Sequence, residues 1–201
     1  MDDVKFSKLF VFINSLVPFA FMAWDFWHNR LGSNPTEFLT RTTGTLTLIF
    51  LLLTLAVTPL RKLTGANWLI RARRMVGLYA YFYAALHLLT YLSFDRAWKL
   101  TTVPGDVWQR QFIAIGMATF LMLTPLAITS TNAMIKRLGK RWGKLHQLIY
   151  PAAIAGVWHY YMLVKADTRK PLMFAFALSL LLAYRIFNAN RKPLMTKATL
   201  S

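Results

Sequence analysis

Long uncharged apolar runs alternate with short charged segments along the whole chain. Each of six runs is close to the roughly 17–25 residues that a helix needs to cross the hydrocarbon core of a bilayer. They cover approximately residues 9–27, 44–60, 75–94, 112–129, 148–164 and 171–187. The pattern predicts an all-α integral membrane protein, in which residues 1–201 form a single domain built as a six-transmembrane-helix bundle.

Basic residues give this predicted bundle a direction. About two thirds of the 24 Lys and Arg residues fall at the amino terminus, in the second-to-third and fourth-to-fifth connections, and at the carboxyl end. Because Lys and Arg accumulate on the cytoplasmic side of membrane proteins, we expect both termini to face the cytoplasm. The same segments are expected to contact anionic membrane lipids.

The composition excludes several classes of function. The net charge of +17 does not indicate nucleic-acid binding, because the basic residues flank runs that are too apolar for a soluble domain. The chain has no cysteine, so disulfides, iron–sulfur clusters and covalently attached c-type haem are excluded. We find no nucleotide-binding glycine pattern and no paired carboxylates within the spans. The sequence therefore gives no support to a catalytic function.

Two histidines inside the predicted spans carry the main hypothesis about chemistry, since ionisable residues in a membrane are costly and usually functional. His87 and His159 lie roughly 18 and 20 Å from the cytoplasmic ends of their spans, at 1.5 Å per residue. They should therefore sit at nearly the same depth, in the outer half of the membrane. Two neutral imidazoles facing each other form a six-coordinate haem site suited to electron transfer. The sequence thus predicts haem b with His87 and His159 as axial iron ligands.

Simpler interpretations of the histidines remain open at this point. Each of the two could be a polar residue hydrogen-bonded to a neighbouring helix. Zinc is less favoured, because no third or fourth ligand occurs at the same depth. His28 lies just outside the first span and is expected to be a solvated interfacial residue.

His146 raises the question of a second haem, because it lies at the cytoplasmic end of the fifth span. The facing positions on the third span are Arg73 and Arg74, and Arg73 should share the face of His87 to within about 40°. Arginine can hold haem propionates or a flavin phosphate by bidentate hydrogen bonds, but it is a poor iron ligand. Both one and two haems per chain are open. The simpler interpretation of these arginines is a basic flank of the span.

Two segments resemble the MsrQ (YedZ) family, the haem-binding membrane subunits of a bacterial methionine sulfoxide reductase system within the ferric-reductase-like transmembrane group. They are LAITSTNAMIKRLGKRWGKLHQLIYPAAIAGVWHYYMLVK at residues 126–165 and RARRMVGLYAYFYAALHLLTY at residues 71–91. The VTPLR segment at residues 57–61 adds to the resemblance, which covers nearly the whole chain.

The resemblance implies an electron-transfer subunit of the bacterial inner membrane, rather than the catalytic subunit of the system. Electrons would come from the quinol pool or a cytoplasmic flavin reductase and pass to MsrP, a periplasmic molybdopterin subunit that repairs methionine sulfoxide in envelope proteins. FMN is implied as a cofactor beside haem b. The family's haem histidines carry over onto His87, His146 and His159, and its arginine at the start of the third span onto Arg73. Thr40–Gly44 departs from the expected pattern by lacking a histidine, so we assign no haem or quinone role to that loop.

Two rival hypotheses complete the set. A transmembrane ferric or other metal reductase could use the same haem scaffold. Alternatively, a membrane anchor or transporter could carry these histidines without any cofactor, in which case the purified protein would show no haem absorption.

Overall fold

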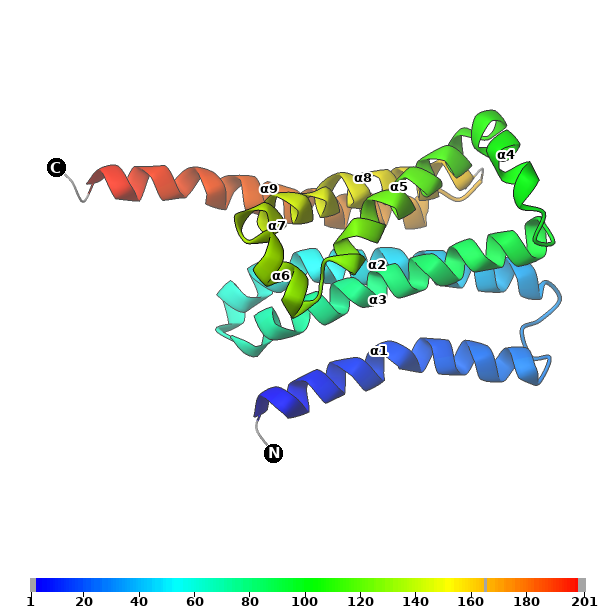
Figure 1. Cartoon of the computed structure of the whole chain (residues 1–201), viewed down its shortest axis with the longest axis horizontal. Coiled ribbons are helices and arrows are strands. Elements are labelled where there is room, and N and C mark those ends of the chain that lie inside the picture. Colours follow the sequence, from blue (N-terminus) through cyan, green and yellow to red (C-terminus); the bar gives the residue numbers. More distant parts are fainter. Residues whose placement is uncertain (1–2, 165, 199–201) are drawn as a thin grey trace.

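The structure, a computed structural model, describes residues 3–164 and 166–198. These residues form helices joined by turns, and no strand occurs among them (Figure 1). Six helices make up the bundle: α1 (Asp3–Trp27), α2 (Pro35–Thr64), α3 (Trp68–Thr90), α5 (Gln111–Ile128), α8 (Ile149–Leu163) and α9 (Arg169–Ala198). A π-helix, Tyr91–Asp95, continues α3, and a 3-10 turn, His146–Leu148, precedes α8.

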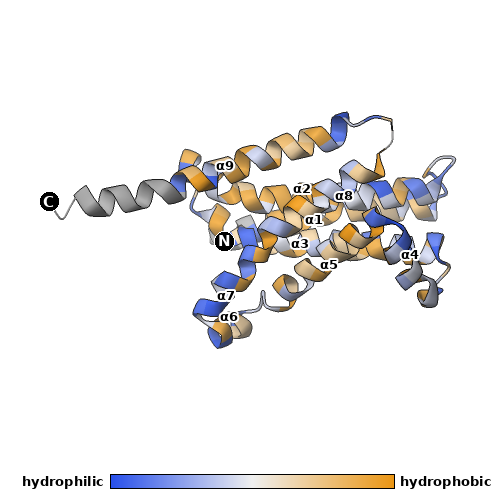
Figure 2. Cartoon of the chain, turned by 90° about the horizontal axis from the view of Figure 1, so that it is seen from above, coloured by the Kyte–Doolittle hydropathy of each residue, from blue (hydrophilic) through white to orange (hydrophobic). Residues whose placement is uncertain are grey.

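Three short helices lie at the two ends of the bundle. The first described residues, the α2–α3 connection, α6 (Asn132–Leu138) and α7 (Lys140–Leu145) lie at one end, toward which the carboxyl end of α9 also points (Figure 1). We call it the α6 end. The opposite end, called the α4 end, carries α4 (Val103–Gln109) and the α1–α2 and α8–α9 connections. Figure 2 shows hydrophilic residues gathered at these ends and apolar residues along the helices between them.

The predicted class is confirmed in its coarse form. Five segments are long and apolar enough to cross a membrane: Lys8–Trp27, Pro35–Thr64, Trp68–Asp95, Gln111–Ile128 and Arg169–Asn188. Large apolar side chains also cover the outer surface, for example Phe10, Phe21 and Phe176, which are 56%, 65% and 68% exposed. The predicted fifth span is present as α8 but is only 15 residues long.

The helix α2 contains the predicted second span, residues 44–60, and begins nine residues before it, at Pro35. The Asn34 side chain accepts a hydrogen bond from the Glu37 backbone N–H, at 3.2 Å, and so caps the helix. Proline at the first helical position and an acidic residue in the first turn complete this start. Because these first turns are polar, the apolar pattern of the sequence did not include them in the predicted span. Residues 40–44 are therefore helical and do not form the expected loop.

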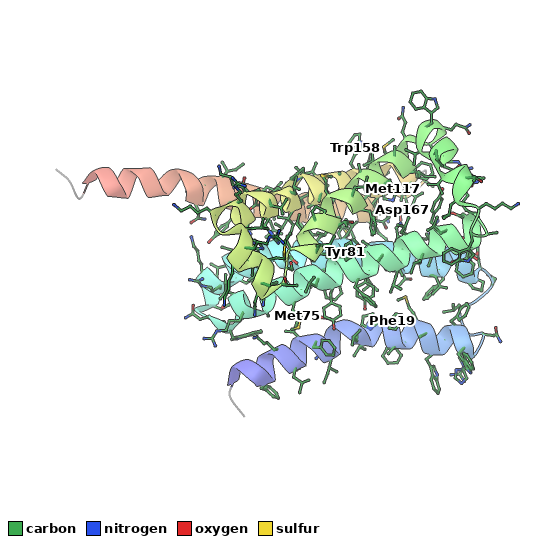
Figure 3. The ribbon with its side chains drawn as sticks, in the orientation of Figure 1. Phe19, Met75, Tyr81, Met117, Trp158 and Asp167 are labelled. Atoms are coloured by element: carbon green, nitrogen blue, oxygen red, sulfur yellow. The ribbon has the colours of Figure 1, made fainter. Side chains whose placement is uncertain are left out.

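The core forms where α2 packs against α3 and α5 packs against α8. α1 lies on the outer side of α3, to which it is joined by hydrogen bonds from tyrosine hydroxyls. The Tyr83 hydroxyl donates to the Ser15 carbonyl at 2.6 Å, and Tyr79 donates to the Phe12 carbonyl at 3.0 Å. Phe19, labelled in Figure 3, meets Phe82 edge-on between the two helices. The two inner helix pairs then face each other, and each pair supplies one intramembrane histidine.

Candidate functional site

His87 of α3 and His159 of α8 face each other between the two helix pairs. Their ring centres are 6.1 Å apart and their planes meet at 80°. The prediction that the two residues lie at one depth is confirmed. Among the described residues, no cluster of three or more His, Asp or Glu side chains is placed to hold a metal ion. The pair is therefore the feature from which a site has to be built.

Both imidazoles are held by a backbone carbonyl of the neighbouring helix. His87 Nδ1 lies 2.9 Å from the Thr40 oxygen of α2, and His159 Nδ1 lies 2.6 Å from the Phe112 oxygen of α5. A carbonyl oxygen can only accept, so Nδ1 must carry the proton in each ring. This leaves Nε2 unprotonated, with a lone pair available to a metal.

A glycine makes each of these contacts possible. Gly44 follows Thr40 by four residues, and Gly116 follows Phe112 by the same interval. Because helical side chains lean toward the amino terminus, a residue at this spacing normally covers the carbonyl that precedes it. A Cβ on Gly44 would lie 3.1 Å from the His87 ring, and one on Gly116 would lie 2.8 Å from the His159 ring. We call each carbonyl with its glycine an imidazole seat; the helix pairs contain one seat each.

A cavity of about 290 Å³ opens between the two rings, within α2, α3, α5 and α8. Most of its lining is apolar, including Leu48 and Leu51 of α2 and Met117 and Leu123 of α5. Met117 is labelled on α5 in Figure 3. Its charged lining residues, Arg41, Asp95 and Arg110, come from the parts of their helices nearest the α4 end.

These residues fit a haem with two histidine ligands. A metal bound at about 2 Å from each Nε2 would hold the two ring centres about 6 Å apart, as estimated from metal–imidazole bonds. The observed separation of 6.1 Å agrees with that value. The apolar lining suits a porphyrin, and both Nε2 atoms are chemically free to bind iron.

His146 lies apart from this pair, roughly 20 Å from His159 along the helix axis. Its Nδ1 bonds to the Trp142 carbonyl of its own helical run at 3.1 Å, and its ring stacks on Trp142. Its Nε2 is buried and has no hydrogen-bond partner within the described residues. The positive charge of Arg73 lies close enough to act on the His146 ring. The structure thus brings His146 and Arg73 together at the α6 end.

A further arginine, near the carboxyl end of the predicted sixth span, joins this cluster. Arg185 of α9 donates to the Tyr150 hydroxyl at 2.6 Å and to the Leu55 carbonyl at 3.2 Å. Its charge is close enough to Arg73 for the two to repel each other. Its Nε is buried without a partner, and no acidic side chain pairs with it across the part of the chain that the structure describes. We call His146, Arg73, Arg185 and Tyr150 the basic cluster.

Arg74 and His28 lie outside both groups. Arg74 is exposed and donates to the Asn132 side chain at 2.7 Å, so it links α3 to α6. Its predicted role in cofactor binding remains a prediction. His28 is also exposed, and its Nδ1 bonds to the Trp24 carbonyl at 2.8 Å, as expected for an interfacial residue.

Comparison with known proteins places the chain in a family of membrane proteins. Residues 43–157 match the family described as ferric reductase like transmembrane component. Three similar proteins carry the name protein-methionine-sulfoxide reductase heme-binding subunit MsrQ. The protein of Herminiimonas arsenicoxydans is 48% identical over 92% of this chain and 86% of its own length. That of Rhodospirillum rubrum is 47% identical over 95% and 92%, and that of Azospira oryzae 47% over 92% and 80%.

The chain therefore belongs to the ferric reductase like transmembrane family and, within it, to the family of the MsrQ subunits. The resemblance seen in the sequence is thereby confirmed. No solved structure matches the chain.

Proposed function

We propose that this chain binds haem b between His87 and His159 and carries electrons across the bacterial inner membrane to a methionine sulfoxide reductase. The observation that carries the proposal is the pair of opposed imidazoles, each with Nδ1–H donated to a carbonyl and Nε2 left free. Haem with two histidine ligands exchanges single electrons and leaves no open position for substrate. The relatives are named heme-binding subunits, which supports the same cofactor.

The direction of electron transfer follows from the distribution of basic residues between the two ends of the bundle. The α6 end carries most of the Lys and Arg residues and the start of α1, and the carboxyl end of α9 points the same way, so we assign it to the cytoplasm. His87 and His159 are then nearer the outer face. A quinol or a cytoplasmic flavin reductase would supply the electrons, and a periplasmic MsrP-type molybdopterin subunit would receive them. The relatives' names favour this role over a metal reductase.

We propose six membrane spans, with α8 as the short one. The 3-10 turn His146–Leu148 runs directly into α8, so helical structure continues from His146 to Leu163. At the rise of each helix type this run is roughly 28 Å long, close to the thickness of the hydrocarbon core. With six spans, both termini lie on the cytoplasmic side.

The basic cluster is the proposed site of a second cofactor. Its arginines have no acidic partner among the described residues, and an anion would neutralise them. The phosphate of FMN and the propionates of a second haem both have the required charge. His146 would bind the flavin through its buried Nε2 or, in the second case, ligate iron.

Absorption spectra of purified protein test the first site. Reduced-minus-oxidised difference spectra and pyridine haemochrome assays give the haem content per chain. We expect His87→Ala and His159→Ala each to lose the haem held by the pair, because one axial ligand is gone, and His28→Ala to match the unmodified protein. Full haem content in both of the first two variants would contradict the axial assignment. A colourless unmodified protein, expressed with adequate haem, would favour an anchor or transporter.

His146→Ala tests the basic cluster with the same assay. We expect the signal of the His87–His159 haem to persist, since His146 lies roughly 20 Å away along the helix. A fall from two haems to one per chain would make His146 an iron ligand. An unchanged haem content with weaker FMN binding would assign the cluster to FMN.

A further inference from the structure

The cavity between the histidines is polar at one end and apolar at the other. Arg41 lies near the start of α2 and Leu51 lies ten residues further along, roughly 15 Å toward the α6 end. Arg110 directly precedes α5, and Leu123 lies about 20 Å deeper along that helix. Haem has the same asymmetry, because its two propionate carboxylates project from one edge of an otherwise apolar ring.

Arg110 is the cation at the mouth of the cavity with the most available charge. Its side chain is exposed and makes no hydrogen bond or ion pair with any described residue. The nearest acid in sequence, Asp106, is buried and already bound by Tyr91 and Arg96. Arg110 also precedes a helix start that no side chain caps, where the backbone carries partial positive charge. A cation in this position favours an anionic ligand.

Arg41 stands on the facing helix, next to the carbonyl that holds His87. It pairs with Glu37 at 2.6 Å, and the side chains are 73% and 47% exposed. Exposed ion pairs of this kind contribute little, so Arg41 can turn to another anion at small cost. Asp95 also lines this mouth and would repel a carboxylate, which leaves the two arginines as the groups that attract one.

We propose that Arg110, assisted by Arg41, binds the propionates of the haem held by His87 and His159. This inference rests on the haem site proposed above and adds the orientation of the ring. The propionate edge points to the α4 end, and the apolar edge lies against Leu51 and Leu123. The arginines of the basic cluster, at the opposite end of the bundle, are thus not the partners of this haem.

Redox titration of the purified haem protein tests the assignment, with the haem spectrum as the readout. A positive charge beside the haem stabilises the reduced form, which has one positive charge fewer at iron. We expect Arg110→Gln to lower the ratio of reduced to oxidised haem about tenfold at a fixed potential, a shift of about 59 mV for one electron. Arg41→Gln should give a smaller shift in the same direction. Arg110→Lys should restore most of the potential.

Arg30→Gln is the matched control, because it removes a charge at the same end of the bundle from a residue that does not line the cavity. Reconstitution with haem dimethyl ester, whose propionates are uncharged, isolates the contact itself. With this ring no carboxylate holds the exposed Arg110 side chain at the haem, so Arg110→Gln should no longer shift the potential. An equal shift with both rings would mean that Arg110 lies beside the haem without binding a propionate, and the propionate assignment would be wrong.

The outcomes also separate this inference from the haem site itself. If Arg110→Gln and Arg30→Gln have the same potential with ordinary haem, the propionate assignment is wrong and the histidine ligation stands. If unmodified protein binds no haem at all, the proposed haem site is wrong, and the proposed orientation of the haem ring is then wrong as well.

Discussion

The two ends of the bundle hold their histidines in opposite ways. Near the α4 end, His87 and His159 each donate to a carbonyl of a neighbouring helix and face each other across a cavity. At the α6 end, His146 bonds within its own helical run and lies near Arg73. The first arrangement fixes two rings from outside their own helices, which a metal with two axial ligands requires. The second places the positive charge of Arg73 near one ring, which favours an anion.

Among the substitutions that test this difference between the two ends, Gly116→Ala should have the largest effect. The new Cβ would lie 2.8 Å from His159, so the imidazole has to leave its seat. Disturbing the groups that orient metal-binding histidines typically costs roughly 10–100-fold in affinity. We expect haem affinity to fall by that amount, measured by titration of apoprotein with haem.

Gly77→Ala is the control for Gly116→Ala. A Cβ there would meet Thr54 at an ordinary 3.6 Å, and alanine favours the helix. Haem affinity should be unchanged in this variant. If the two variants behave alike, the seat is not what holds His159. Gly44→Ala, with its closest contact at 3.1 Å, should fall between them.

An effect of intermediate size should follow Arg185→Lys at the other end. Lysine keeps the charge but cannot form two parallel hydrogen bonds to a phosphate. FMN affinity should fall about tenfold, which corresponds to one charge-assisted hydrogen bond. Quenching of FMN fluorescence measures it, and the haem spectrum of the pair should not move. Arg61→Lys, on an exposed arginine of the same end, should bind FMN normally.

The smallest effect is expected for Arg74→Gln. Its exposed contact with Asn132 joins α3 to α6 and touches neither site. The free energy of unfolding should fall by about 1 kcal/mol or less, and haem and FMN contents should stay the same. Thermal melting followed by circular dichroism checks the first point. Loss of either cofactor would instead place Arg74 in the site, as the sequence had suggested.

The sequence predicted the helical class and the histidine pair for a simple reason. Both histidines lie on helices that start at the same end and run without a break, so counting residues gave their depth. The start of α2 was missed because its first turns are polar. The imidazole seats were also missed. Every residue has a backbone carbonyl, so the sequence does not reveal which carbonyl accepts a hydrogen bond from a histidine. The only available signal was a glycine at residue 44 and another at 116, each within a helical segment.

Arg185 escaped prediction for a different reason. Along the chain it looks like one more basic residue after an apolar run. Its contacts with Tyr150 and the Leu55 carbonyl depend on how α9 packs against α8 and α2, which periodicity does not specify. Which residues form the basic cluster therefore depends on the packing of helices that are far apart in the sequence.

The imidazole seats also determine where the chain tolerates change. Main-chain carbonyls hold His87 and His159, so no substitution at Thr40 or Phe112 can delete the acceptor itself. The constraint passes to the glycines four residues later, whose missing side chains keep the carbonyls accessible. A site of this kind is robust at the residues that make the hydrogen bonds and fragile at residues that make none. Around these histidines, the positions most sensitive to substitution are thus the two glycines, one helical turn after the residues whose carbonyls accept the hydrogen bonds.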